Sequence, residues 1–293
     1  MKLLITGANG LLGQKIVDLC IKKGIHFVAT SKGDNRNSKC PMDKYRRLDI
    51  TDETLVKTVL MEELPTHVIH TAAMTNVDEC ETNPEGCQKI NVDATHYLVK
   101  ACNALNCHFQ LLSTDFIFDG EKGNYAEEDV PNPLSVYAQS KLDAETIVKT
   151  ESTAPWSIVR TIIVYGDGEN LSRSNLVLWA LEAIPKNQEM KIVDDQFRPP
   201  TWADDLAWAC VRICELEEKG VFHISGPETL SILEIVQRIA SYLKESGENI
   251  VPISSSTLAQ AAKRPPKTGF NLTKSREKLG YSPKKLEETL DLL

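Results

Sequence analysis

The stretch Met1-Lys-Leu-Leu-Ile-Thr-Gly-Ala-Asn-Gly-Leu-Leu-Gly13 decides the fold of this 293-residue chain. Residues Lys2–Thr6 form a short apolar run typical of a strand, and the apolar residues after the run recur with a helical period. Gly7, Gly10 and Gly13 therefore fall on a turn from a strand into a helix. Such a turn lets the backbone approach a pyrophosphate closely, and the N-terminus of the helix favours negative charge.

The spacing of these glycines, Gly-x-x-Gly-x-x-Gly, is one residue wider at its start than the usual dinucleotide fingerprint. A tight turn without a ligand is the alternative explanation. Because the glycines come directly after the first strand, we favour the ligand site and predict that this turn binds a dinucleotide.

The rest of the N-terminal part alternates strand and helix patterns. We expect strands at Lys2–Thr6, His26–Thr30, His67–Thr71, His108–Ser113 and Trp156–Arg160, and helices at Glu53–Glu62, Pro84–Leu105 and Ser135–Thr150. This order predicts an α/β fold of the Rossmann type, with a doubly wound parallel sheet covered on both faces. Ligands of such sheets bind outside the carboxyl ends of the strands, so Gly7, Ala72 and Thr114 should cluster at one edge.

The pattern changes after Tyr165, where the elements become shorter. We expect a loop at Gly166–Ser174, helices at Asn175–Ala183 and Ser231–Glu245, and a strand at Val221–Ser225. Residues 1–165 should form the dinucleotide-binding domain and residues 166–293 a smaller, mainly substrate-binding region. The boundary is soft, because chains of this type can cross back to the first domain.

Composition limits the classes of function. The net charge of −8 argues against nucleic acid and anionic membranes as partners, and no apolar run approaches the length of a membrane span. A strand that begins at the second residue leads us to expect no signal peptide. The eight cysteines form no Cys-x-x-Cys pair and the six histidines show no ligand spacing, so we expect no metal site. A reduced, cytoplasmic protein is the expectation.

Tyr137 and Lys141 lie four residues apart on a predicted helix and project from the same face. A free tyrosine has a pKa of about 10, and a nearby ammonium or an oxidised nicotinamide would lower it. Ser113 and Thr114 end the preceding strand, where a hydroxyl could polarise a substrate oxygen. We predict Tyr137 as the proton donor, Thr114 as a hydrogen-bond donor and Lys141 as electrostatic support. The alternative is a solvated surface pair, which the glycine turn in the same chain disfavours.

The end of the second strand bears on the choice of cofactor. A site selective for NAD usually places an acidic residue there to bind the ribose hydroxyls, whereas this chain has Thr30, Ser31 and Lys32, with Arg36 nearby. Hydroxyls and cations suit a 2′-phosphate, so we predict NADP, with NAD as the alternative. A basic solvated loop without this role explains the residues nearly as well.

Motifs along nearly the whole chain resemble those of the extended short-chain dehydrogenases/reductases, and within them the dTDP-4-dehydrorhamnose reductases. They are Thr6-Gly-Ala-Asn-Gly-Leu-Leu-Gly13, Thr71-Ala-Ala73, Val77-Asp78, Ser113-Thr-Asp-Phe-Ile-Phe-Asp-Gly120, Tyr125, Glu127, Asp129, Pro133, Tyr137-Ala-Gln-Ser-Lys-Leu142, Arg160, Val164-Tyr165, Asp195-Gln196, Pro200-Thr201, Asp205-Leu-Ala207 and Arg264-Pro265. The resemblance implies an NAD(P)-dependent oxidoreductase of carbohydrate biosynthesis, acting in the dTDP-rhamnose route on a nucleotide-linked sugar.

The resemblance also implies a set of site residues. The catalytic residues would be Thr114, Tyr137 and Lys141, and the last two would also contact the cofactor. The other cofactor residues would be Gly7, Asn9, Gly10, Leu11, Leu12, Gly13, Ser31, Lys32, Asp49, Ile50, Ala72 and Ala73. The substrate residues would be Thr75, Val77, Asp115, Phe116, Ile163, Arg198 and Arg264. Ile163 stands where the family has a tryptophan, which leaves the identity of the sugar open, and Ala138 replaces the usual glycine after the catalytic tyrosine.

Three functions stay open from the sequence. A reductase of a nucleotide-linked 4-keto-6-deoxy sugar is the first, with Arg198 and Arg264 as candidate ligands of the diphosphate, although solvated charge is an equal explanation for Arg198. An epimerase that retains NAD is the second, and a non-catalytic NADP-binding regulatory subunit is the third. A dehydratase is disfavoured because Phe116, and not an acidic residue, follows Asp115. A homodimer is compatible with the sequence.

Overall fold

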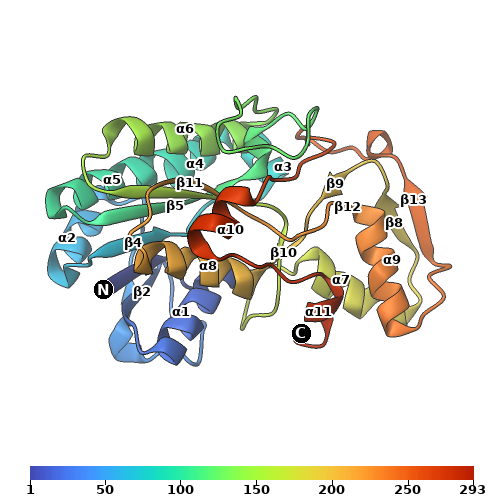
Figure 1. Cartoon of the computed structure of the whole chain (residues 1–293), viewed down its shortest axis with the longest axis horizontal. Helices are drawn as coiled ribbons and strands as arrows, with labels where there is room; N and C mark the ends of the chain where they lie inside the picture. The colour runs from blue at the N-terminus through green and yellow to red at the C-terminus, as the bar shows by residue number, and fades with distance from the viewer.

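A seven-stranded parallel sheet forms the centre of the computed structural model, which describes residues 1–293 (Figure 1). The strands follow the order β11-β6-β5-β4-β1-β2-β3 across the sheet. Their bounds are β1 Lys2–Thr6, β2 His26–Ser31, β3 Tyr45–Arg47, β4 His67–His70, β5 His108–Thr114, β6 Trp156–Thr161 and β11 Gly220–Ile224. The predicted Rossmann-type fold is confirmed.

The central strands read as continuous apolar runs because both of their faces are covered. Every residue of β4 and of β5 is buried, which is typical of a parallel sheet between two layers of helices. The register pairs Thr6 with His70 and Thr114 with Thr161. The carboxyl ends of these strands are therefore aligned along one edge, where the loops that follow them meet.

Helices cover the sheet on both sides (Figure 1). On one face, α2 (Glu53–Glu63), α5 (Ala94–Leu105) and α6 (Val136–Glu151) enclose a core cluster of 18 buried residues. On the other face, α1 (Leu11–Lys23), α8 (Ala203–Glu215) and α10 (Thr273–Leu279) enclose a cluster of 29. These two layers hold the ends of the strands in place.

The helix predicted over Pro84–Leu105 is divided into three parts. It begins as α4 (Pro84–Cys87), continues as the π-helical turn η2 (Gln88–Asp93) and becomes α5. The π-turn carries Asn91, whose side chain donates to the carbonyl of Met74 and accepts from its amide, at 3.0 and 2.8 Å. The widened turn thus fixes the loop that leaves β4, and π-turns are frequent at functional sites.

The second half of the chain builds a smaller lobe with a core of 15 buried residues (Figure 1). Its elements are β7 Val164–Tyr165, α7 Leu176–Ala183, η4 Ile184–Lys186, β8 Met190–Val193, β9 Phe197–Arg198, β10 Thr201–Trp202, β12 Leu230–Ser231, α9 Ile232–Leu243, β13 Ile250–Ile253, η5 Ser255–Thr257 and α11 Glu287–Leu290. Three short elements of the first half complete the structure, and they are η1 Met42–Lys44, α3 Val77–Thr82 and η3 Asp115–Ile117. A capping box between Ser231 and Glu234 starts α9, which explains why the predicted helix begins there.

The second half also returns to the first. Strand β11 pairs with β6 in parallel register, so residues 220–224 complete one edge of the main sheet. Helices α8 and α10, from the same half, pack on the large core cluster. The sequence pattern predicted a strand at Val221–Ser225, and the structure shows that it belongs to the Rossmann sheet.

All eight cysteines are free and buried. Burial raises the pKa of Cys20 to about 12 and that of Cys40 to about 11. None of the helices combines the length and the apolar character that crossing a bilayer requires.

Candidate active site

A cavity of about 920 Å³ lies at the carboxyl edge of the sheet, between the two lobes. All the catalytic, cofactor and substrate residues implied by the family resemblance line this cavity. The fold therefore brings together the glycine turn near residue 10, the strand ends near residues 31, 72 and 114, helix α6 and the loops near residues 163, 198 and 264. The roles of the individual residues stay predictions.

The glycine turn is shaped by contacts within the protein as well as by its opening to the cavity. Gly7 has a φ of +70°, and a Cβ there would lie 2.7 Å from the amide nitrogen of Ala72. A Cβ on Gly13 would lie 2.3 Å from the carbonyl oxygen of Gly7. Gly10 precedes α1 without a capping side chain, and the first turn of α1 holds no acidic residue. The free N–H groups of this turn fit an anionic pyrophosphate.

At the end of β2, Ser31 and Lys32 line the cavity, and Lys32 Nζ lies 3.0 Å from the carboxylate of Asp49. Two neighbours that the sequence grouped with them do not reach it. Thr30 is fully buried and donates to the carbonyl of Ile5 at 3.1 Å, so its hydroxyl cannot bind a ribose. Arg36 points instead towards the carbonyl of Asn170, at 3.5 Å.

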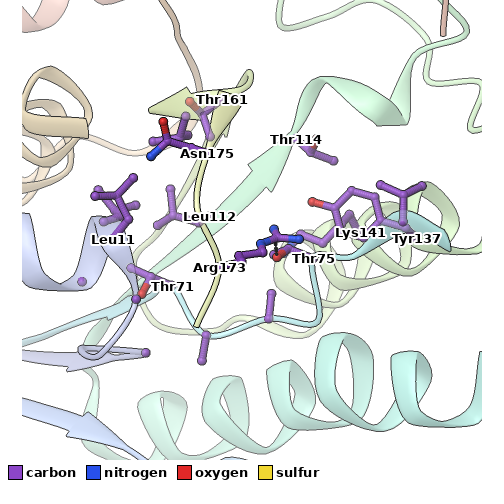
Figure 2. Close-up of a pocket in the computed structure, with 18 of the residues that line it drawn as sticks. Leu11, Thr71, Thr75, Leu112, Thr114, Tyr137, Lys141, Thr161, Arg173 and Asn175 are labelled. Atoms are coloured by element: carbon purple, nitrogen blue, oxygen red, sulfur yellow. Dashed lines mark hydrogen bonds between the residues drawn. The ribbon is translucent and has the colours of Figure 1, made fainter. Parts of the chain in front are cut away.

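Helix α6 begins at Val136 with Ser135 as its N-cap, and it projects Tyr137 and Lys141 towards the same side (Figure 2). The two side chains are 9% and 4% exposed, so the pair is not a solvated surface pair. Thr114 ends β5 nearby, accepts from the amide of Phe116 and donates to Asp115 Oδ1 at 3.1 Å.

Ser113 carries the second hydroxyl predicted at this strand end, and that hydroxyl is already engaged. Its Oγ donates to Glu145 Oε1 at 2.7 Å, inside the core behind α6. The hydroxyl beside Tyr137 at the end of β5 is therefore that of Thr114, which donates to Asp115 in this structure.

Burial controls the protonation of the pair. It raises the pKa of Tyr137 well above the ordinary value, and the neighbouring Thr114 and Arg173 lower it by a smaller amount. We expected Lys141 to lower this pKa, but in the structure the desolvation of Tyr137 outweighs the contacts that lower its pKa. Burial also lowers the pKa of Lys141 to about 8, against the opposing charge of Glu145.

The two arginines predicted to bind a diphosphate both have carboxylate partners. Arg198 is buried, lies 3.3 Å from Asp115 Oδ2 and stacks over Phe116 with its guanidinium 4.8 Å from the ring centre. Arg264 makes a two-point ion pair with Asp78, at 2.7 and 3.2 Å. Each pair ties the second half of the chain to the first.

Two features of the cavity wall were missed by the sequence analysis. Arg173 reaches across the cavity from the loop before α7 and donates to Thr75 Oγ1 at 2.6 Å (Figure 2). Thr161 lines the same cavity, and its buried hydroxyl has no hydrogen-bond partner within the protein. Neither residue belongs to a motif with a regular spacing. Their only sequence signal is that both follow the buried part of β6, on the side of the sheet where ligands bind.

Ile163 lies on the wall between β6 and β7, with a φ of +33°. A positive φ is rare for a β-branched residue, because the side chain crowds the backbone. The backbone here is therefore held by its surroundings in a strained form, and such strain is concentrated at ligand sites.

Comparisons with known proteins show the family of this chain. Residues 1–293 match the family described as RmlD substrate binding domain. The dTDP-4-dehydrorhamnose reductase of Aggregatibacter actinomycetemcomitans is 29% identical over 302 residues, which cover 99% of this chain and 97% of that protein. The methionine adenosyltransferase 2 subunit beta of Bos taurus is 29% identical over 269 residues, which cover 90% of this chain and 78% of that protein.

Among solved structures, a dTDP-4-dehydrorhamnose reductase from Bacillus anthracis in complex with NADP is similar, with a TM-score of 0.85 and 27% identity. The alignment covers 99% of this chain and 97% of that chain. These matches confirm the resemblance drawn from the sequence motifs, and the chain belongs to the RmlD substrate binding domain family.

Proposed function

We propose that this protein is an NADPH-dependent reductase of a nucleotide-linked 4-keto-6-deoxy sugar, of the dTDP-4-dehydrorhamnose reductase type. The observation that carries the proposal is the meeting of Thr114, Tyr137 and Lys141 with the glycine turn in one cavity. A relative in the same family is a dTDP-4-dehydrorhamnose reductase, and a structural neighbour of that kind binds NADP.

The residues of the cavity fit a dinucleotide. The free N–H groups after Gly10 would hold the pyrophosphate, and Ser31 and Lys32 would contact the adenosine end. The unpartnered Thr161 hydroxyl lies at the opposite end of the site, towards Thr114. A bound NADPH would supply the hydride that reduces C4 of the sugar.

The protein's own contribution is to position the carbonyl and to deliver a proton. The Thr114 hydroxyl would exchange its bond to Asp115 for a hydrogen bond donated to the sugar O4. Tyr137 would give its phenolic proton to the same oxygen as C4 is reduced. A raised pKa keeps Tyr137 protonated before reaction, as a proton donor requires. The Lys141 ammonium would then stabilise the phenolate that remains.

Two alternatives rest on weaker support. An epimerase that retains NAD would share the fold, but two similar UDP-glucose 4-epimerase structures are 20% and 23% identical and show the fold alone. A regulatory subunit is favoured by the 29% identity to methionine adenosyltransferase 2 subunit beta, which equals the identity to the reductase. We place the reductase first because this chain keeps all three catalytic residue types within one cavity.

The proposal also includes the roles of the two parts of the chain and the location of the protein in the cell. Residues 166–293 would mainly bind the nucleotide sugar and residues 1–165 the dinucleotide, with β11 as a return into the sheet. Eight free cysteines support a reducing compartment, and therefore a cytoplasmic location.

The test is the oxidation of NADPH by the purified protein with dTDP-, UDP- and GDP-linked 4-keto-6-deoxy sugars. We expect stoichiometric formation of NADP⁺ and of the 4-hydroxy sugar with at least one of them, and none without sugar. An epimerase would interconvert sugars without net oxidation of the cofactor. A regulatory subunit would bind NADPH, consume none with any sugar and co-purify with a partner enzyme.

A further inference from the structure

The loop of residues 166–175, which we call the strap, crosses the cavity between β7 and α7. Its middle is hydrogen-bonded on the side of the glycine turn. There the Glu169 carboxylate accepts from the backbone amide and from the hydroxyl of Ser38, both at 2.7 Å. The amide of Glu169 also donates to Gln14 Oε1 at 2.8 Å. Its far end reaches the opposite wall through the bond from Arg173 to Thr75. The strap thus spans from the cofactor side to the side of Tyr137.

Arg173 differs from the other cations of the cavity in what surrounds it. Lys32, Arg198 and Arg264 each lie within 4 Å of a carboxylate oxygen, whereas Arg173 forms no ion pair. The single hydrogen bond of the Arg173 guanidinium goes to a neutral hydroxyl. Lys141 also has no ion pair, but it is buried in α6 and Arg173 is exposed to the cavity. An unpaired guanidinium is therefore available to a ligand that enters.

The position of Arg173 indicates which ligand this is. The pyrophosphate of a dinucleotide would lie at the glycine turn, on the N-terminus of α1. Arg173 instead contacts Thr75, beyond the end of β4, and its charge acts on Tyr137. The group that must come close to Tyr137 is the sugar substrate, which carries its diphosphate next to the sugar ring. The start of α7 lines the cavity beside Arg173 with Ser174, Asn175 and Leu176. The backbone N–H groups at this helix N-terminus carry partial positive charge, as the guanidinium carries positive charge.

We propose that Arg173 is a specificity-determining residue that binds the diphosphate of the nucleotide sugar. Its guanidinium would exchange the hydrogen bond to Thr75 for hydrogen bonds to the phosphate oxygens. The inference rests on the proposed reductase function. The exchange is favourable because a guanidinium binds phosphate through two charge-assisted hydrogen bonds, which are stronger than one bond to a hydroxyl. Arg198 and Arg264, already paired with Asp115 and Asp78, would shape the pocket without supplying a free charge.

The experiment measures the dissociation constants of dTDP, UDP and GDP by calorimetry in the presence of saturating NADP⁺, and that of NADP⁺ separately. The variants are Arg173→Ala and Arg173→Lys, with Lys39→Ala as a control for the loss of one positive charge. Lys39 is exposed, pairs with Asp18 and does not line the cavity. We expect Arg173→Ala to weaken the best nucleoside diphosphate by about tenfold or more, the effect of losing a charge-assisted bidentate contact.

The other variants sharpen the expectation. Arg173→Lys should recover part of the affinity, because lysine keeps the positive charge but cannot make the two parallel hydrogen bonds of a guanidinium. Lys39→Ala should bind like the wild type, and the affinity for NADP⁺ should be unchanged in all three variants.

Three results would overturn the inference. One is an unchanged affinity for the nucleoside diphosphates in Arg173→Ala. Another is a loss of NADP⁺ affinity in Arg173→Ala as large as the loss of diphosphate affinity, which would place Arg173 on the cofactor. A third is a wild type that binds none of the three diphosphates. The proposed reductase function is decided separately by NADPH oxidation, which continues at the wild-type level in Arg173→Ala if only the inference is wrong.

Discussion

Glu145 on α6 and Arg160 on β6 form a fully buried two-point ion pair, with 2.9 Å between Oε1 and Nε and 2.8 Å between Oε2 and Nη2. Glu145 lies one turn after Lys141 on the same face of α6. Arg160 also donates to the carbonyl of Glu127 at 3.1 Å, which joins the sheet to the loop before α6. Glu145 therefore links the position of α6 to the sheet.

Replacing Glu145 should destabilise the protein strongly. Glu145→Gln leaves the Arg160 charge buried without a partner, and breaking a buried pair in this way costs about 3–5 kcal/mol. The free energy of unfolding from urea titrations measures the loss. Lys149→Ala is the matched control, since Lys149 contacts the same carboxylate from a partly exposed position, 2.9 Å away. That change should cost under about 1 kcal/mol. Equal losses in the two variants would mean that the buried pair is not structural.

Tyr137→Phe should remove the proton donor and keep the packing of the ring. General acid catalysis contributes about 10²–10⁴-fold, so kcat should fall by that order. The dissociation constant of NADPH, measured by fluorescence, should be close to that of the wild type because the ring remains in place. A kcat within about twofold of the wild type would show that Tyr137 does not deliver the proton.

The activity should fall on the alkaline side as Lys141 loses its proton. Its pKa is lowered to about 8, so a rise in pH through that value removes the ammonium that supports the phenolate of Tyr137. The pH profile of kcat/KM reports ionisations of the free enzyme and should bend downwards near pH 8. In Lys141→Arg the guanidinium stays charged, so the bend should disappear even if the rate is lower. The same bend in that variant would assign it to another group.

Lys32→Ala should weaken NADPH and leave NADH unchanged, because Lys32 is the cation of the cavity nearest the predicted 2′-phosphate. An exposed charge-assisted contact of this kind should be worth about tenfold in affinity, or about 1.4 kcal/mol. Arg36→Ala is the control, since Arg36 points away towards Asn170. Titration of both cofactors against both variants measures the effect. A wild type that strongly prefers NADH would contradict this assignment of the adenosine end.

Ile163→Trp should raise kcat/KM for the dTDP-linked 4-keto sugar if the pocket is otherwise of the rhamnose type. A side chain of this size is worth about 1–3 kcal/mol in a hydrophobic pocket, which is enough to change the preference among related sugars. Ile163→Leu, with the same volume, controls for disturbance of the strained backbone at this position. If the wild type turns over that sugar efficiently and the tryptophan variant does so equally well, Ile163 does not determine the sugar specificity.

The sequence predicted the ends of the buried parallel strands to within one residue, because such strands are apolar runs that end where polar residues begin, as at Thr6. It could not predict the partners of Arg198 and Arg264. Asp115 and Asp78 lie 83 and 186 residues away in the chain, and only the fold brings them together. The strap was predicted as a loop, but no periodicity indicates where a loop will run, so the contact of Arg173 was missed. The π-turn near Asn91 has no pattern of its own.

The return of β11 to the sheet has a consequence for how the protein is made. While the ribosome has synthesised only the first two-thirds of the chain, β6 is an edge strand with unpaired backbone groups, and α1 lacks the α8 helix that covers it. Such edges and apolar faces pair readily with other chains. Nascent chains that stop before Ile224 should therefore need chaperones, and fragments ending near residue 165 should aggregate when expressed alone.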